Sequence, residues 1–195
     1  AKLLGDPSVE FAERSTLYRE RGLSSDTSIF PDYALELSLE AIKAKGLLAP
    51  GSVRRVAVVG PGLDYADKGE GYDFYPQQTI QPFAVIDSLV RLGLAKPNDL
   101  KLVTFDLSPR INEHLAAARA RALKGGAYTV QLVRDPEAGW TPELIGYWER
   151  FGDRIGEPVA AATPPAGSGP LKVRAVRIRP AVVASITSED LNIVL

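Results

Sequence analysis

Residues 54–64, with the sequence RRVAVVGPGLD, contain the sharpest change from a strand pattern to a loop pattern in the chain. The apolar run 56–59 predicts a short buried strand. Gly60 and Gly62 follow it directly, and glycine lets the backbone turn tightly and lets a ligand approach closely. Asp64 then places a carboxylate beside this loop. We interpret the segment as one wall of a nucleotide-type site.

A second strand pattern, residues 102–105, is followed directly by Asp106. Ser108 suits the N-cap of a helix and Pro109 suits its first position. Ligands of open parallel sheets bind beyond the carboxyl ends of the strands. The glycine loop and Asp106 are therefore expected to line the same site, where a carboxylate can accept both hydroxyls of a ribose.

Helix and strand patterns alternate along the chain, which favours an α/β fold with a parallel sheet. Helices are predicted over 32–46, with Asp32 as N-cap, and over 82–92, 109–122 and 142–151; further strands are predicted over 128–133 and 171–179. A shorter helical pattern covers 9–21. We expect residues 1–50 to form an N-terminal helical extension and residues 51–195 to form one cofactor-binding domain. The Gly- and Pro-rich stretch 156–170 is predicted to be a flexible loop.

The composition excludes several classes of protein. The net charge is −1 with acids and bases interspersed, which gives no strong signal for nucleic-acid binding. The chain has no cysteine, so it has no thiol nucleophile, and no His and carboxylate cluster shows metal-ligand spacing. No apolar run approaches the roughly 20 residues that span a bilayer. A soluble, cytoplasmic protein is the default expectation. Because the chain starts at Ala1 and lacks methionine, an upstream targeting segment stays an open alternative.

The ligand expected at the glycine loop carries no phosphate. The dinucleotide fingerprint G-x-G-x-x-G is only partly met, because Tyr65 stands at the third glycine position. Asp64 would also repel a pyrophosphate. S-adenosylmethionine has a ribose, an ammonium and a sulfonium group, so the charges favour it over NAD.

The segment VAVVGPGLD resembles motif I of the class I S-adenosylmethionine-dependent methyltransferases, and VTFDLSPR resembles the second-strand motif of that family. The resemblance implies that Gly60 and Gly62 line the methionine and ribose parts of the cofactor. It implies that Asp106 binds the ribose hydroxyls and that Leu107 lies against the adenine. Asp190, in the segment DLN, is similar to the acid that often meets the adenine amino group.

The resemblance also implies a Rossmann-like three-layer fold, with helices on both faces of a parallel sheet, and methyl transfer to an acceptor that the sequence does not identify. The chain departs from the family in two ways. The family usually has an acid within or just before the glycine loop, whereas Asp64 follows the loop here, and the interval between the loop and Asp106 is long. The later strands are missing. Three explanations stay open: a fragment, a sheet completed elsewhere, or a divergent relative. A non-catalytic binding or scaffold domain is the alternative function, and an NAD(P)-dependent oxidoreductase is a weaker one.

The insertion 66–81 is polar and Gly-rich yet carries three aromatic residues. Tyr72 and Tyr75 would form either a lid or substrate wall, or an anchor that holds a long loop, and the anchor is slightly favoured. His114 is expected to be a surface residue rather than a catalytic base. Arg174, Arg177 and Arg179 are expected on a solvated strand face, and an anionic partner is the less favoured alternative.

Overall fold

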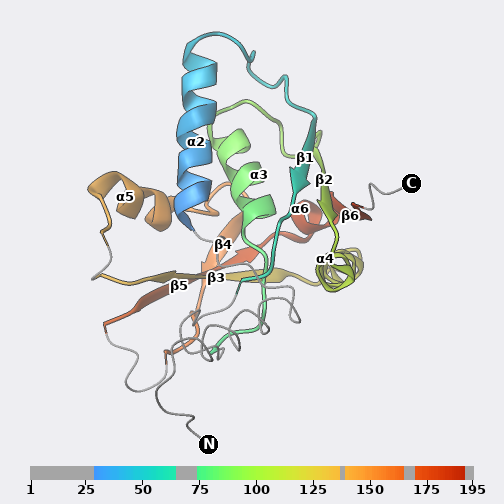
Figure 1. Ribbon diagram of the computed structural model, residues 1–195, viewed down its shortest axis with the longest axis vertical. Coiled ribbons are helices and arrows are strands. Elements are labelled where there is room, and N and C mark those ends of the chain that lie inside the picture. The colour runs from blue at the N-terminus through green and yellow to red at the C-terminus, as the bar shows by residue number, and fades with distance from the viewer. Residues whose placement is uncertain (1–28, 65–73, 137–138, 165–169, 192–195) are drawn as a thin grey trace, which may run out of the picture.

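The structure is a computed structural model that describes residues 29–64, 74–136, 139–164 and 170–191 (Figure 1). Its helices in these ranges are α2 (Ile29–Ala44), α3 (Gln81–Arg91), α4 (Pro109–Ala122), α5 (Pro142–Arg150) and α6 (Pro180–Ala184). Its strands are β1 (Arg55–Val59), β2 (Lys101–Asp106), β3 (Tyr128–Arg134), β4 (Gly156–Val159), β5 (Lys172–Ile178) and β6 (Ile186–Asp190). The prediction of a mixed α/β fold is confirmed. The helical pattern over 9–21 lies outside the described residues.

The described strands form two sheets of different kinds. The first is parallel, in the order β1-β2-β6, and the second is antiparallel, in the order β3-β5-β4. The expectation that β3 and β5 join the parallel sheet is therefore wrong. A strand pattern does not specify which partner the strand pairs with. The antiparallel sheet and α5 are inserted in the chain between α4 and β6. β2 and β6 are therefore distant in sequence, although they are neighbours in the parallel sheet (Figure 1).

Two local predictions in the inserted part are also wrong. Residues 156–159, expected in a flexible loop, form β4, an edge strand where Pro158 is tolerated because one side of the strand needs no N–H partner. Arg174 does not lie on a solvated face. Its Nη1 donates hydrogen bonds to the carbonyl oxygens of Trp148 (2.7 Å) and Phe151 (2.9 Å), so it binds the carboxyl end of α5.

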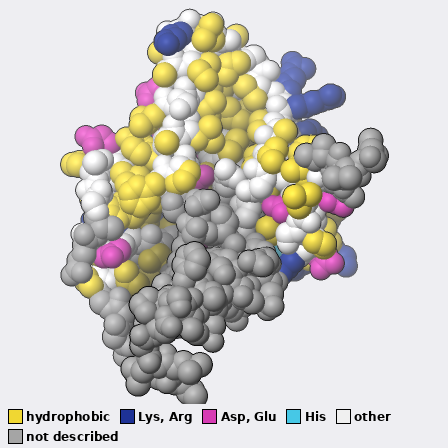
Figure 2. All heavy atoms as spheres, viewed as in Figure 1, with side chains coloured by type: hydrophobic (Ala, Val, Ile, Leu, Met, Phe, Trp, Pro, Cys, Tyr) yellow, Lys and Arg dark blue, Asp and Glu magenta, His cyan; other side chains and the backbone are white. Residues whose placement is uncertain are grey.

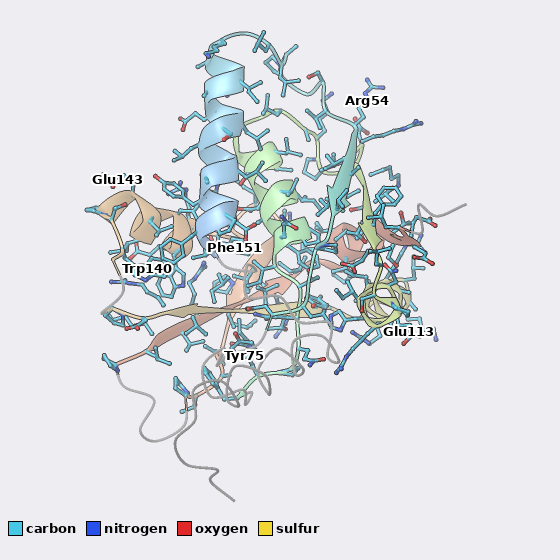
Figure 3. All side chains as sticks on the ribbon, viewed as in Figure 1. Arg54, Tyr75, Glu113, Trp140, Glu143 and Phe151 are labelled. Carbon is cyan, nitrogen blue, oxygen red and sulfur yellow. The ribbon has the colours of Figure 1, made fainter. Side chains whose placement is uncertain are left out.

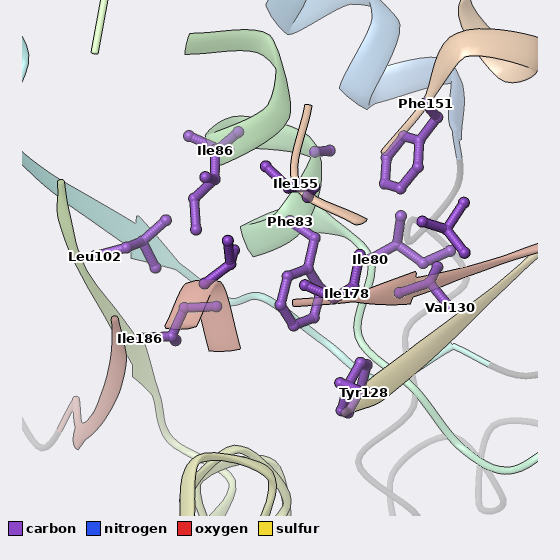
Figure 4. Close-up of a cluster of buried hydrophobic side chains, with 14 of the residues drawn as sticks. Ile80, Phe83, Ile86, Leu102, Tyr128, Val130, Phe151, Ile155, Ile178 and Ile186 are labelled. Atoms are coloured by element: carbon purple, nitrogen blue, oxygen red, sulfur yellow. The ribbon is translucent and has the colours of Figure 1, made fainter. Parts of the chain in front are cut away.

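Both sheets share one hydrophobic core that is built around α3. Figure 4 shows Phe83 and Ile86 of α3 between Leu102 and Ile186 of the parallel sheet and Val130 of the antiparallel sheet. Every residue from Pro82 to Leu89 is buried, so α3 is covered on all sides instead of along one stripe. The two sheets therefore pack as one body around this helix.

Gln78 joins the loop after β1 to the antiparallel sheet. Its backbone pairs with Asp64, with N···O distances of 2.6 and 3.1 Å. Its side-chain amide pairs with the backbone of Gln131 in β3: Nε2 donates to the carbonyl oxygen and Oε1 accepts from the N–H, both at 2.7 Å. Because β3 is an edge strand, this amide replaces the missing neighbour at that position.

We predict that Gln78→Ala lowers the free energy of unfolding by about 2–4 kcal/mol, since it leaves two backbone groups of Gln131 unpaired and each costs about 1–3 kcal/mol when buried. Urea unfolding measures the change. Gln77→Ala is the matched control, because the Gln77 side chain accepts one bond from Arg110 at an exposed site. Equal losses in the two variants would contradict the role given to Gln78.

Candidate functional site

The carboxyl ends of the three parallel strands bring together the residues that the sequence predicts to bind a ligand. Val59 at the end of β1 pairs with Phe105, and the Gly60 N–H donates to the Phe105 carbonyl oxygen at 2.8 Å. Asp106 at the end of β2 pairs with Asp190 at the end of β6. The glycine loop and the two acids therefore lie along a single sheet edge, which we call the carboxyl edge.

The glycine loop has a conformation that requires glycine. Gly60 and Gly62 have φ angles of +66° and +63°, in the left-handed region that L side chains rarely adopt. A Cβ atom on Gly60 would meet nothing within 4 Å, so the space beside this backbone is open. The loop can therefore present its backbone to a ligand at close range.

Asp106 and Leu107 lie at the centre of the carboxyl edge. Asp106 Oδ1 accepts a hydrogen bond from the Ser108 N–H at 2.8 Å, and its carbonyl oxygen accepts one from Asn112 Nδ2 at 2.9 Å. Ser108 occupies the N-cap position of α4, but its side chain makes no capping bond. The apolar side chains of Leu107 and Val59 are 68% and 64% exposed at these strand ends, and Asp190 is also exposed. The edge thus offers carboxylates beside open apolar surface.

The parallel sheet has opposite charges at its two ends. Exposed cations stand at the amino ends of the strands: Arg54, Arg55 and Lys101. Figure 2 shows dark blue side chains where Figure 3 labels Arg54. Acids stand at the other end: Asp106, Glu189 and Asp190. This arrangement favours cationic groups at the carboxyl edge and disfavours phosphate.

Asp64 and Tyr75 are buried and in contact. The Tyr75 hydroxyl donates to Asp64 Oδ2 at 3.4 Å, and its ring meets Phe74 edge to face. Tyr75 lies on the far side of β3 from Phe151 (Figure 3). Because Tyr75 is buried and bonded to Asp64, its placement favours the role of an anchor that holds the long loop over the role of a lid. Tyr72 lies outside the described residues.

His114 is half-buried and hydrogen-bonded, so the expectation of a surface residue is wrong. Its Nε2 lies 2.7 Å from the Tyr128 hydroxyl, which also accepts the Thr79 N–H at 2.8 Å. Burial, followed by the charges of Arg121 and Arg110, lowers the pKa of His114. This neutral histidine links α4 to β3.

Sequence reasoning missed the role of Asp32. α2 begins at Ile29, so Asp32 is not an N-cap but lies in the first turn, where it is 3% exposed. The buried face of α2 carries Ile29, Asp32 and Glu36, while Leu35 is only partly buried. The spacing i, i+3, i+7 of these residues is the signal that could have found this face. Burial, and then the charge of Asp64, raise the pKa of Asp32 to about 7.

Comparison with family models, with curated proteins and with solved structures finds no match to this chain. In the described ranges, no group of three or more His, Cys, Asp or Glu side chains is placed to hold a metal ion. No helix in the described part of the chain has the length and apolar character needed to cross a bilayer. The site must therefore be interpreted from its own geometry and charge.

We predict that Asp32→Asn changes how stability depends on pH. The folded protein keeps a proton on Asp32 that the unfolded chain releases near its ordinary pKa of 3.8. This group therefore favours folding below about pH 4, and its contribution is lost as the pH rises to about 7. Relative to the wild type, the variant should gain roughly 4 kcal/mol between about pH 4 and about pH 8, since the rise from 3.8 to about 7 spans about three pKa units and one unit corresponds to about 1.4 kcal/mol.

Urea unfolding across this pH range measures the gain. Glu40→Gln, which removes an exposed acid from the same helix, is the control and should track the wild type. A constant difference between Asp32→Asn and the wild type at all pH values would contradict the assignment of a raised pKa to Asp32.

Proposed function

We propose that the carboxyl edge binds S-adenosylmethionine and that the chain is part of a Rossmann-like, methyltransferase-type domain. The observation that carries this proposal is the alignment of Gly60, Asp106 and Asp190 at neighbouring ends of parallel strands. The connections β1-α3-β2 and β2-α4 agree with a doubly wound sheet, in which ligands bind beyond the carboxyl ends. The sequence motifs and the strand order support the same assignment.

The residues present fit the parts of this cofactor. Gly60 leaves open space for the methionine and ribose portion. Asp106 uses Oδ1 for the Ser108 N–H, and its Oδ2 makes no hydrogen bond to any described residue, so it can accept a ribose hydroxyl. Leu107 offers exposed apolar surface to an adenine, and Asp190 offers a carboxylate to its amino group.

When bound, S-adenosylmethionine supplies a methyl group on a sulfonium. In methyl transfer the protein mainly holds the methyl donor and the acceptor in line. The absence of an assigned general base therefore does not weigh against the proposal. The alternative is a non-catalytic binding domain with the same site. An NAD(P)-dependent oxidoreductase is the weaker candidate, because the acids of the carboxyl edge disfavour a pyrophosphate.

We predict that isothermal titration calorimetry detects binding of S-adenosylhomocysteine and not of NADH. The acids of the carboxyl edge attract the ammonium group of the first ligand and repel the pyrophosphate of the second. Binding of NADH alone would support the oxidoreductase. No binding of S-adenosylhomocysteine would contradict the proposal.

We predict that Asp106→Ala weakens the binding of S-adenosylhomocysteine by about 1–3 kcal/mol, which is the scale of one lost hydrogen bond to a charged group. Asp99→Ala is the matched control, because Asp99 is an exposed acid near the amino end of the same strand. The same calorimetric titration compares the two variants, with circular dichroism as the check on folding. Unchanged affinity in Asp106→Ala would refute the ribose assignment.

A further inference from the structure

The exposed side of α2 is apolar along its whole length. A surface helix ordinarily has polar residues on the side that faces solvent, and a helix that is apolar on its outer side as well is normally covered. α2 buries one side through Ile29 and Glu36, yet its opposite side is built from five exposed apolar residues: Phe30, Ala34, Leu37, Ala41 and Ala44. Figure 2 shows hydrophobic side chains over α2 that continue toward α5. We call these five residues the α2 stripe.

The residues of the α2 stripe are regularly spaced. They are separated by 4, 3, 4 and 3 residues, which is the heptad spacing of a helix that pairs with another helix. Phe30 and Leu37 are its large members, with 45% and 46% of their surface exposed. Single exposed apolar residues are common on protein surfaces, whereas a contiguous apolar patch marks an interaction site. The pattern therefore indicates that a second helix covers this side of α2.

Large and small residues alternate along the α2 stripe. Phe30 is followed by Ala34, and Leu37 is followed by Ala41. When two copies of α2 run in opposite directions, a register that places Leu37 beside the partner's Ala34 also places Phe30 beside the partner's Ala41, because both pairs are centred on the same point of the helix. Each of these layers then holds one large and one small residue, which fills the interface without overlap. A parallel pairing in register would place two Phe30 side chains against each other and leave two alanines facing in the next layer.

The charges around the α2 stripe favour the same antiparallel direction. Glu143 and Glu149 are exposed on α5, which packs beside the N-terminal half of α2. The C-terminal end of α2 carries exposed Lys43, and exposed Lys45 follows it. Figure 2 shows magenta side chains where Figure 3 labels Glu143, and dark blue at the far end of α2. Antiparallel pairing brings the basic end of one subunit toward the acidic end of the other and also opposes the two helix dipoles.

We propose that the chain forms a homodimer in which two copies of the α2 stripe pair antiparallel around a twofold axis. A twofold interface needs a surface that is complementary to itself, and the alternation of sizes in the α2 stripe meets this condition. The helix has 16 residues and is therefore about 24 Å long. A contact of this length lies at the lower end of specific interfaces, so we expect a reversible dimer with a dissociation constant of about 1–100 μM. The proposal does not depend on the ligand of the carboxyl edge.

Sedimentation velocity of the full chain, at concentrations from well below to well above this range, tests the dimer. Leu37→Glu puts a charge at the centre of the α2 stripe and should weaken association by roughly 10-fold or more. Ala41→Glu should act in the same way, and it keeps a good helix former at an exposed position. Leu123→Glu is the matched control, because Leu123 is 63% exposed at the end of α4, and it should dimerise like the wild type. Circular dichroism checks that each variant folds.

Introduced cysteines report the direction of pairing, because the chain has no cysteine of its own. Under oxidising conditions, a mixture of Phe30→Cys and Ala41→Cys should form a mixed disulfide dimer. Ala41→Cys alone should form none, since antiparallel pairing separates the two copies of position 41 by about 16 Å along the helix, far beyond the reach of a disulfide. A disulfide dimer of Ala41→Cys alone would contradict the antiparallel direction.

Two results of the sedimentation experiment would overturn the proposal. The first is a wild type that stays monomeric at every concentration, which includes the case in which residues 1–28 of the same chain cover the α2 stripe. The second is a dimer that neither Leu37→Glu nor Ala41→Glu weakens, because its interface would then lie elsewhere.

Discussion

The burial of α3 on every side, from Pro82 to Leu89, is the constraint on which the rest of this structure depends. A helix covered on every side must satisfy its polar groups inside the protein. Burial raises the pKa of Asp87, and the ion pair with Arg91 and the Arg154 N–H, at 3.0 Å, oppose this shift. Arg91 also donates to the carbonyl oxygen of Arg150, and Arg150 binds Glu36. One network of buried and partly buried charges therefore fixes α2 and α5 against α3, while the apolar side chains of α3 hold the two sheets together.

The position of the candidate site follows from this packing. With α2 held against α3, Asp32 comes within electrostatic reach of Asp64 in the loop after β1, and Gln78 connects this loop to β3. The site is assembled from segments that are far apart in sequence. A change in the buried network would therefore disturb the ligand site even where no residue of the carboxyl edge is altered.

The inserted antiparallel sheet accounts for the long stretch of sequence between Asp106 and Asp190. Residues between α4 and β6 form a separate sheet with α5, and the chain then returns so that Asp190 stands beside Asp106. The alignment of three strand ends is preserved despite the insertion. Acids at this edge and cations at the opposite ends of the strands give the sheet a polarity that suits a ligand with an ammonium and no phosphate. The proposal that this edge binds S-adenosylmethionine rests on this combination.

The sequence by itself determined the features that depend on neighbouring residues: β1, the turn at Gly60, β2 with its terminal acid, and the start of α4 at Pro109. Glycine at positive φ and proline at a first helical position act within a few residues, so they can be read locally. Only the tertiary structure decided that β3 and β5 form their own sheet, because a strand pattern does not specify its partner. It alone decided that α2 buries Asp32 and Glu36 and leaves its leucines half-covered. The groups that surround those acids come from α3, α5 and the loop after β1, which meet α2 only in the folded chain.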